Sequence, residues 1–486
     1  MLLDGNHLTR DDVVRVARAG EPVTLTPSAV ERMRDGRDVV EETLAAGATV
    51  YGFTTGVGER KRIHVEPGTV EAFNSLLIAN HRVGQGPPAT DEIVRGTLVC
   101  LINLLASGNA GVRPELAQHL ASVLNNGPLP TVRSRGSVGQ ADLAPLADLA
   151  AGALATADLR PAAGEGLALI DNNAYATASA ALALDDADRL LESADVAGAL
   201  DLEAFGANLS ALDPAVARAR PYPGLQETLL HLQALLRASG LWAPGAARNL
   251  QDPLTFRCLP QVHGAARDGL RFANRQLAIE LNAAQGNPLV VTASRTVRSV
   301  GNFDIIPLAQ ALDFSRIALA PVLTSAAERL EKLLQGWLTG LPAGLASAEG
   351  LAEDGLAEFG LTAQALTAEA RLLAQPVSFE LTTSTHAAGI EDRVTMAPLA
   401  ARRLQEMVNL GERVLAIALV VAAQAVDRRG LARLGSGTRA AHALARSVVR
   451  LQGRGQVVPA DLEPLVDLIH SGRLVAVADE ASARIS

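Results

Sequence analysis

Cysteine, lysine and aromatic residues are scarce in this chain of 486 residues. The two cysteines, Cys100 and Cys258, stand far apart inside apolar stretches, which predicts small buried side chains rather than a disulfide framework. Lysine occurs only at Lys61 and Lys332, so arginine carries nearly all of the positive charge. Aromatic residues make up 3% of the chain, so alanine, leucine and valine must fill the core, and such a core is typically helical.

Motifs that hold metals or phosphates are also missing. The sequence has no His-Glu-x-x-His, Cys-x-x-Cys or Walker pattern, so we expect no metal site. The formal net charge of −9 comes without a basic stripe, which argues against a nucleic-acid partner. The short cluster Arg60-Lys61-Arg62 is interpreted as a solvated loop.

The sequence also shows no clear signal for export or for a membrane. Its first residues lack a basic start followed by an apolar segment, so no signal peptide is expected. The longest apolar run, residues 414–423, is much shorter than a membrane span. We therefore expect a cytoplasmic protein without a membrane partner.

Helix signals are frequent along the chain. Thr9 with Asp12 three residues later resembles a capping box, and Thr26 followed by Pro27 marks a second helix start, with Gly47 as its stop. Long helical patterns are predicted near residues 265–282, 308–334, 360–373 and 398–426, and helices of this length pack most easily side by side in a bundle.

Glycine-dense segments lie apart from the long helices, at residues 51–58, 84–88, 136–139 and 286–288. Glycine permits tight turns and close backbone approach, so these segments are candidate site loops. Helical patterns dominate from about residue 198. We therefore predict a mainly α protein with a smaller, loop-rich N-terminal domain (residues 1–197) and a long-helix domain (residues 198–486).

Many segments resemble the histidine and aromatic amino-acid ammonia-lyases. The similar segments, in chain order, are residues 8–14, 51–58, 80–86, 103–115, 136–146, 165–170, 251–252, 257–265, 280–282, 287–289, 301–303 and 391–392. Each segment is a weak signal, but their number and order are specific. The resemblance implies an elongated helical bundle and a homotetramer whose active sites combine residues from several subunits.

One segment departs from the family where its chemistry resides. The family reads Gly-Ser-Val-Gly, then Ala-Ser-Gly, then Asp-Leu-Ala-Pro-Leu, and the Ala-Ser-Gly triad cyclises into the electrophile methylidene-imidazolone. Here Gln140-Ala141 stands in place of the triad, one residue short. The serine that becomes the methylidene and the glycine nitrogen that closes the ring are both absent from this site. The resemblance therefore implies a lyase frame without its electrophile.

Further departures fall on positions that the family uses. Relative to the family pattern, leucine replaces a functional tyrosine at Leu254, aspartate replaces an asparagine at Asp171, aspartates replace histidines at Asp148 and Asp304, arginine replaces a histidine at Arg393, and isoleucine replaces a glutamine at Ile390. Random substitution of surface residues would not be expected to concentrate changes at these positions.

Three residues are the predicted catalytic groups. Tyr51 matches the family tyrosine and would be a general base or acid, although a phenol is a poor base unless a helix N-terminus or a cation lowers its pKa. Glu391 and Asp171 would carry protons or hold a cationic amine. The alternatives are a buried tyrosine with a satisfied hydroxyl and, for Asp171, a helix cap or a solvated position.

The remaining site residues are predicted substrate contacts. By resemblance, Arg257 would clamp a substrate carboxylate, and the alternative is an internal salt bridge to Asp252 or Glu391. His81 either faces the substrate or is a satisfied core histidine, whereas His263 is expected to be structural. The other predicted contacts are Asn80, Gln140, Asn173, Leu254 and Asp304, of which Asp304 is equally well interpreted as a cap.

The rate acceleration that acid–base groups can supply limits the reactions that are possible without the electrophile. Positioned acid–base groups supply roughly 10²–10⁴-fold acceleration, whereas enzymes commonly need about 10⁶-fold or more. A catalyst without the electrophile and without another cofactor therefore needs an activated small-molecule substrate, such as one with a carboxylate or an amine. We expect elimination, conjugate addition or cyclisation, in specialised metabolism. The alternatives are a non-catalytic tetrameric scaffold and, with less support, a conventional amino-acid ammonia-lyase.

Overall fold

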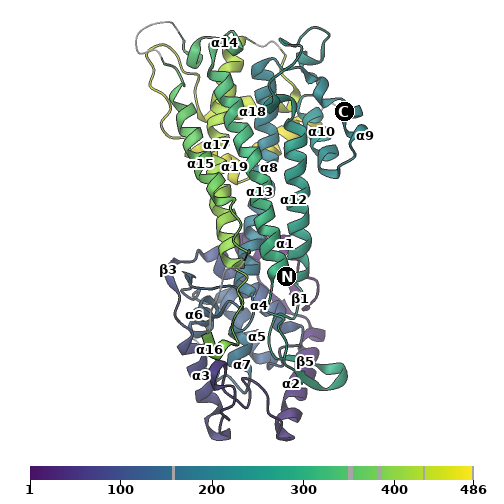
Figure 1. Cartoon of the computed structure of the whole chain (residues 1–486), viewed down its shortest axis with the longest axis vertical. Coiled ribbons are helices and arrows are strands. Elements are labelled where there is room, and N and C mark those ends of the chain that lie inside the picture. The colour runs from purple at the N-terminus through teal and green to yellow at the C-terminus, as the bar shows by residue number, and fades with distance from the viewer. Residues whose placement is uncertain (156–158, 348–353, 380–385, 431–432, 484–486) are drawn as a thin grey trace. The chain divides into compact units, whose positions relative to one another are not determined.

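The computed structural model describes residues 1–155, 159–347, 354–379, 386–430 and 433–483, and Figure 1 labels many of its helices and strands. The chain groups into two compact units. Unit 1 comprises residues 1–185, 273–313 and 376–402, and unit 2 comprises residues 186–272, 314–375 and 403–486. Each unit thus uses three stretches of chain. The single division between residues 197 and 198 remains a prediction about folding domains.

Unit 1 contains shorter helices joined by loops. Its helices are α1 (Arg10–Ala19), α2 (Pro27–Ala45), α3 (Val70–Asn80), α4 (Asp91–Ala106), α5 (Pro114–Asn126), α6 (Leu143–Leu154), α7 (Glu165–Ile170) and α16 (His386–Gly389). The predicted capping box at Thr9 and Asp12 is confirmed, and the Thr26 side chain caps α2, which begins at Pro27. Helices therefore occupy much of the first 197 residues, between the glycine-dense loops.

The strands of unit 1 form three small two-stranded sheets. Strand β1 (Leu2–Leu3) pairs in parallel with β2 (Thr24–Leu25). Strand β3 (Gln85–Pro88) pairs antiparallel with β4 (Arg133–Arg135), and β5 (Leu289–Val291) pairs antiparallel with β6 (Thr296–Arg298). In the β5–β6 pair, Val290 faces Val297. These sheets are too short to form a core and serve to fix loops.

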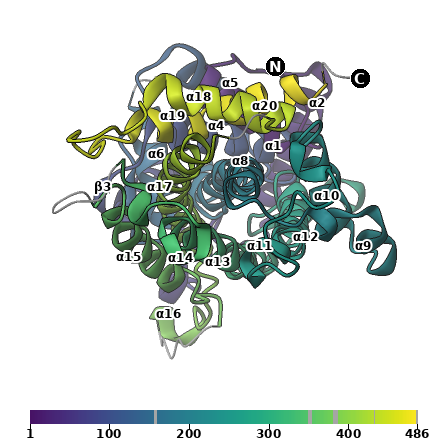
Figure 2. The same ribbon diagram turned by 90° about the horizontal axis from the view of Figure 1, so that it is seen from above.

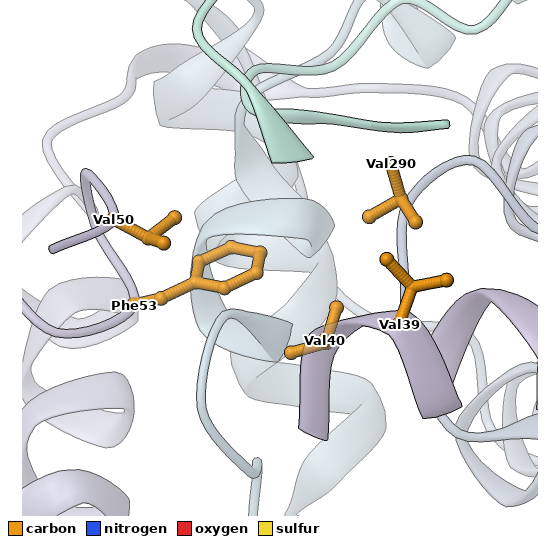
Figure 3. Packing of buried hydrophobic residues seen from close by; sticks show 5 residues of the cluster. All are labelled: Val39, Val40, Val50, Phe53 and Val290. Carbon is orange, nitrogen blue, oxygen red and sulfur yellow. The ribbon is translucent and has the colours of Figure 1, made fainter. Parts of the chain in front are cut away.

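A small apolar cluster fixes the loop that carries Tyr51. Val50 and Phe53, on either side of Tyr51, pack with Val39 and Val40 of α2 and with Val290 of β5, and all five are buried (Figure 3). Removing such side chains from water favours one placement of the loop. Tyr51 itself lies between its two anchored neighbours, so the packing sets where its ring can lie.

Four long helices have residues in both units. They are α8 (Ala174–Phe205), α12 (Leu259–Glu280), α13 (Ile306–Leu334) and α17 (Ala397–Arg429), and the four predicted long helices correspond to α12, α13, α15 and α17. Helix α8 begins well before residue 198, so the helical part starts earlier than predicted. The remaining helices of unit 2 are α9 (Pro214–Ala219), α10 (Pro223–Leu235), α11 (Leu254–Arg257), α14 (Gly336–Thr339), α15 (Glu358–Leu373), α18 (Ser436–Val448), α19 (Glu463–His470) and α20 (Arg473–Ala483).

Helix α8 is the centre of unit 2. Its residues there are almost all buried, and α10, α12, α13 and α17 surround it in the end-on view of Figure 2. A helix that is buried on all sides needs small apolar residues, and alanine is frequent in α8. Its buried carboxylates are paired: Asp195 contacts His263 of α12 at 2.7 Å, and Asp201 contacts Arg329 of α13 at 2.7 Å. His263 is buried in this contact, in line with the predicted structural role.

Two further sequence predictions can be compared with the fold. Cys100 is buried as expected, but Cys258 is only half-buried, because it lies in the short turn between α11 and α12. Among the described residues, one helix, α13, is long and apolar enough to cross a membrane by length and composition, and 56% of its most apolar window is buried. A core helix of a soluble protein passes the same test.

Candidate active site

Tyr51 lines a cavity in unit 1 together with most of the predicted catalytic and binding residues. The cavity has a volume of about 500 Å³, and its lining includes His81, Gln140, Asp171, Asp304 and Glu391. A second cavity of about 860 Å³ shares His81, Gln140 and Glu391 with the first and is lined by Asn80 as well. Predicted residues that are distant from one another in the sequence therefore line the same cavities.

The Tyr51 hydroxyl is held by the backbone. It accepts a hydrogen bond from the Gly58 N–H at 3.0 Å. Burial raises the pKa of Tyr51, and the charges of Asp171 and Glu391 raise it further, while the Gly58 hydrogen bond lowers it. A tyrosine base would need a lowered pKa, and burial raises the pKa of Tyr51 instead. Tyr51 therefore keeps its proton near neutral pH and is suited to donate it.

Asp171 is the neighbouring acid. It follows the last residue of α7 and is only 8% exposed. Burial raises its pKa to about 8, the charge of Glu391 adds to the increase, and the Asn287 backbone N–H opposes it. The carboxyl group is therefore mostly neutral at pH 7. Its burial shows that the alternative of a solvated loop residue is wrong.

Glu391 is the accessible carboxylate of the site. Its side chain is 45% exposed, and its Oε2 lies 3.9 Å from Nε2 of His386. Its Oε1 is 4.0 Å from the position that a Cβ on Gly58 would take. Gly58 therefore lies between the Tyr51 hydroxyl, to which it donates, and Glu391. This arrangement places a protonated phenol, a neutral acid and an exposed carboxylate on one cavity.

Hydrogen bonds on both sides of Gln140 fix the position of this segment. The Gly139 carbonyl accepts hydrogen bonds from Thr395 at 2.6 Å and from the Asn173 side chain at 3.3 Å. The Asp142 N–H donates to the Asn172 carbonyl at 2.7 Å. Ala141 has a φ of +54°, a left-handed conformation that costs a residue with a side chain some strain. These contacts hold Gln140 at the junction of the two cavities.

Two of the replaced positions contact each other. Arg393 donates from its Nε to Asp304 Oδ2 at 3.1 Å, and Asp304 Oδ1 accepts from the Ile306 N–H at the start of α13. Asp304 also forms an isolated bridge with Gln140. The expectation that Asp304 is a cap thus agrees with its hydrogen bond, although the residue also lines the smaller cavity. Asp148, the third position at which the family pattern has a histidine, contacts Arg82 at 3.4 Å.

Other predicted residues lie around or away from the cavities. His81 lines both cavities, and its Nδ1 lies 2.7 Å from the Leu77 carbonyl, so its ring orientation is fixed. Asn173 is fully buried and lines neither cavity, because its amide holds Gly139. Its structural contact was not anticipated from the sequence.

Arg257 and Leu254 belong to α11 of unit 2 and line neither cavity. Among the described residues Arg257 forms no ion pair, and its Nε is buried without a hydrogen-bond partner. The expected alternative, a salt bridge to Asp252, is wrong, since Asp252 accepts from the Asn208 N–H and the Asn249 side chain. Leu254 is 61% exposed.

Comparison with known proteins places these observations in a family. The family model described as aromatic amino acid lyase matches residues 8–447 of the chain. The chain belongs to the aromatic amino acid lyase family. Among its relatives are histidine ammonia-lyases of Symbiobacterium thermophilum and Gloeobacter violaceus, each 38% identical; the alignments cover 98% and 100% of this chain and 97% and 98% of the relatives.

Solved structures of the family have the same fold. The histidine ammonia-lyase of Trypanosoma cruzi is 31% identical with a TM-score of 0.89, covering 99% of this chain and 95% of that one. The ergothioneine-degrading enzyme ergothionase of Treponema denticola is 27% identical with a TM-score of 0.90, covering 98% and 99%. This aromatic amino acid lyase family member therefore shares the mainly α fold of these proteins along its whole length.

The sequence did not identify Lys61 as a site residue of this family member. It lines the smaller cavity, whereas the cluster Arg60-Lys61-Arg62 had been interpreted as a solvated loop. Arg62 is exposed and lines neither cavity, so the interpretation holds for that residue. The sequence signal that could have identified Lys61 is its position, because it follows the glycine-dense segment that carries Tyr51.

Proposed function

We propose that this protein is a lyase that acts by acid–base chemistry, without methylidene-imidazolone, on a substrate that is already activated. The observation that carries the proposal is the pair Gln140-Ala141 at the position of the family triad. It is supported by the acids Tyr51, Asp171 and Glu391, which line the same cavity as Gln140. A frame that keeps proton donors and acceptors without the electrophile suits elimination, conjugate addition or cyclisation.

The residues at this site do not fit the ring. Gln140 and Ala141 supply neither the serine nor the glycine from which it forms. The backbone groups on either side are already engaged, the Gly139 carbonyl with two donors and the Asp142 N–H with the Asn172 carbonyl.

In the proposed elimination, Glu391 removes an acidic proton from the carbon next to a carbonyl group. The electron pair of that C–H bond forms the new double bond while the bond to the leaving group breaks with its pair. Tyr51 or Asp171 protonates the leaving group, because burial keeps both in their protonated forms. Conjugate addition is the same sequence in reverse. Water afterwards restores the protonation states.

A panel of substrates tests this function. We expect β-amino thioesters or β-amino ketones to lose their amine, since the proton that is removed lies next to a carbonyl group. Free L-histidine, L-phenylalanine and L-tyrosine should remain at the background rate. Absorbance of the conjugated product measures each reaction. Brisk deamination of a free amino acid would contradict the proposal.

The conventional ammonia-lyase is the main alternative. The relatives named histidine ammonia-lyase favour it. The ergothioneine-degrading relative extends the family to a different substrate. Both kinds of relative support a small amino-acid-derived substrate. Ergothioneine belongs in the substrate panel for that reason.

The scaffold alternative has less support. A site that has lost catalysis tends to fill with apolar side chains, because buried polar groups without partners are costly. Leu254 and Ile390 would be such replacements. Leu254 lines neither cavity, and Ile390 lines the smaller cavity but is 44% exposed rather than buried. The polar lining is retained, which favours a catalyst.

We further propose a cytoplasmic homotetramer of specialised metabolism. Large apolar side chains such as Leu250 and Trp337, 93% and 82% exposed, suit burial between subunits. In such an assembly Arg257 of one subunit would complete the site of another and bind a carboxylate. Light scattering coupled to size-exclusion chromatography measures the mass of the assembly.

A further inference from the structure

The side-chain carboxamide of Gln140 forms no hydrogen bond with the described part of the chain. The buried Gln285 shows how a structural glutamine of this protein is held instead. Its Nε2 donates to the Thr177 hydroxyl at 3.2 Å, and its Oε1 accepts from the Asn173 N–H at 3.2 Å. Polar groups that are withdrawn from water without a partner are costly, so the open hydrogen-bonding capacity of Gln140 indicates a role toward a ligand.

The two ends of this carboxamide differ in their surroundings. Gln140 is half-buried and lines both cavities, but its Oε1 is covered by protein. Because the oxygen is covered, Nε2 is the polar atom of the side chain that remains to face the cavities. A side-chain amide nitrogen donates hydrogen bonds and does not accept them. The junction of the two cavities therefore presents an N–H donor.

The backbone that carries this donor is held in one conformation. The Ser137 hydroxyl accepts from the Gly139 N–H at 3.1 Å and donates to the Asp142 carboxylate at 2.8 Å. Ala141, directly after Gln140, keeps its left-handed conformation although it is not a glycine. Such strained residues persist where the surrounding structure holds them, and they are frequent at active sites. A donor fixed in this way can stabilise a developing charge without first having to reorganise.

The proposed reaction creates a charge that needs such a donor. When Glu391 removes a proton from the carbon next to a carbonyl group, negative charge develops on the carbonyl oxygen. Tyr51 and Asp171, the protonated acids of the smaller cavity, are assigned to the leaving group in that reaction. Gln140 lines the same cavity as all three residues and has an amide N–H to offer.

We propose that Gln140 is a further catalytic residue, which donates from its side-chain amide to the carbonyl oxygen of the substrate and stabilises the enolate formed there. The inference rests on the proposed function, because it takes this cavity to be the substrate site. The electron pair of the broken C–H bond moves into the enolate, and the proton moves to Glu391. Return of a proton from Glu391 to the same carbon restores the carbonyl compound. The substrate class is therefore a ketone or thioester whose carbonyl oxygen is accessible.

Exchange of carbon-bound protons measures this step without elimination. The probe is 4-phenylbutan-2-one, a ketone that has no leaving group, and ¹H NMR in D₂O follows the loss of the protons next to its carbonyl group. We expect the wild-type protein to catalyse the exchange and Gln140→Met to be slower by roughly 10²–10³-fold, the usual effect of removing one donor to an oxyanion. Gln118→Met is the matched control, because Gln118 is an exposed glutamine of α5 that lines neither cavity.

Infrared spectroscopy tests the hydrogen bond itself. With ¹³C at the carbonyl carbon, the C=O stretch of the bound ketone is separated from the protein background. We expect this stretch to lie at a lower wavenumber in the wild-type complex than in an apolar solvent, and to move back to a higher wavenumber in the Gln140→Met complex. The Gln118→Met complex should give the wild-type spectrum. Thermal unfolding of both variants shows whether the fold is kept.

Three results would overturn the inference: the wild-type protein does not bind the ketone, the stretch in the wild-type complex equals that in the apolar solvent, or Gln140→Met keeps the wild-type stretch and exchange rate. The first two need no variant, so the test stands even if Gln140→Met does not fold. A protein whose exchange depends on Gln140 but that eliminates no substrate of the panel would refute the proposed elimination and leave the role of Gln140 intact.

Discussion

Replacing Tyr51 with phenylalanine is expected to lower turnover of an activated substrate by roughly 10²–10⁴-fold, the range that a positioned acid–base group supplies. The substitution removes the hydroxyl that burial keeps protonated and leaves the aromatic ring in place. It also leaves the Gly58 N–H without its partner, which costs about 1 kcal/mol of stability. Steady-state kinetics on the best substrate of the panel measures the loss.

Tyr222→Phe is the matched control for this experiment. Tyr222 belongs to unit 2, is 57% exposed and lines neither cavity, so the same chemical change should leave turnover unaltered. Thermal unfolding of both variants shows whether the fold is kept. Full activity in a folded Tyr51→Phe variant would remove Tyr51 from the mechanism.

Replacing Asp171 with asparagine should stabilise the protein at alkaline pH by several kcal/mol. The folded-state pKa of about 8 lies above the ordinary value of 3.8, so the folded protein holds this proton more tightly than the unfolded chain. The stability from Asp171 is fully present below about pH 4 and is lost as the pH rises through about 8. The wild type should therefore lose about 1.4 kcal/mol per pH unit relative to the variant across that window.

Chemical denaturation of both proteins between pH 4 and 9 measures this difference. We expect the two curves to converge near pH 4 and to separate with rising pH until about pH 8, after which the gap stays constant. Asp392→Asn is the matched control, because it removes an exposed acid that lines the same cavity. A constant gap between Asp171→Asn and the wild type at every pH would mean that Asp171 titrates normally.

Local signals were the most reliable guide to the fold. The side-chain caps at Thr9 and Thr26 and the stripes of α12 and α13 depend on neighbours in sequence, so they could be predicted directly. The compact units could not, because unit 1 recruits residues 273–313 and 376–402 from distant parts of the chain. Such pairings depend on tertiary packing, which a single sequence does not display.

The sequence predicted which residues line the site better than it predicted their protonation and surroundings. Resemblance identified Tyr51, Asp171 and Glu391, and all three line one cavity. The sequence left open whether Tyr51 is a base or an acid, because the direction of its pKa shift depends on burial and on the two nearby acids. Lys61 was missed because its arginine neighbours suggested solvent. Both points concern what surrounds a side chain, which spacing along the sequence does not reveal.

The intact mass of the purified protein tests the central claim most directly. Formation of methylidene-imidazolone removes two water molecules from the polypeptide, and Gln140-Ala141 lacks the residues for that reaction. We predict the full mass of the 486-residue sequence, with no absorbance from a ring at this segment. A polypeptide lighter by two waters, with the loss mapped by peptide analysis to residues 139–142, would contradict the account.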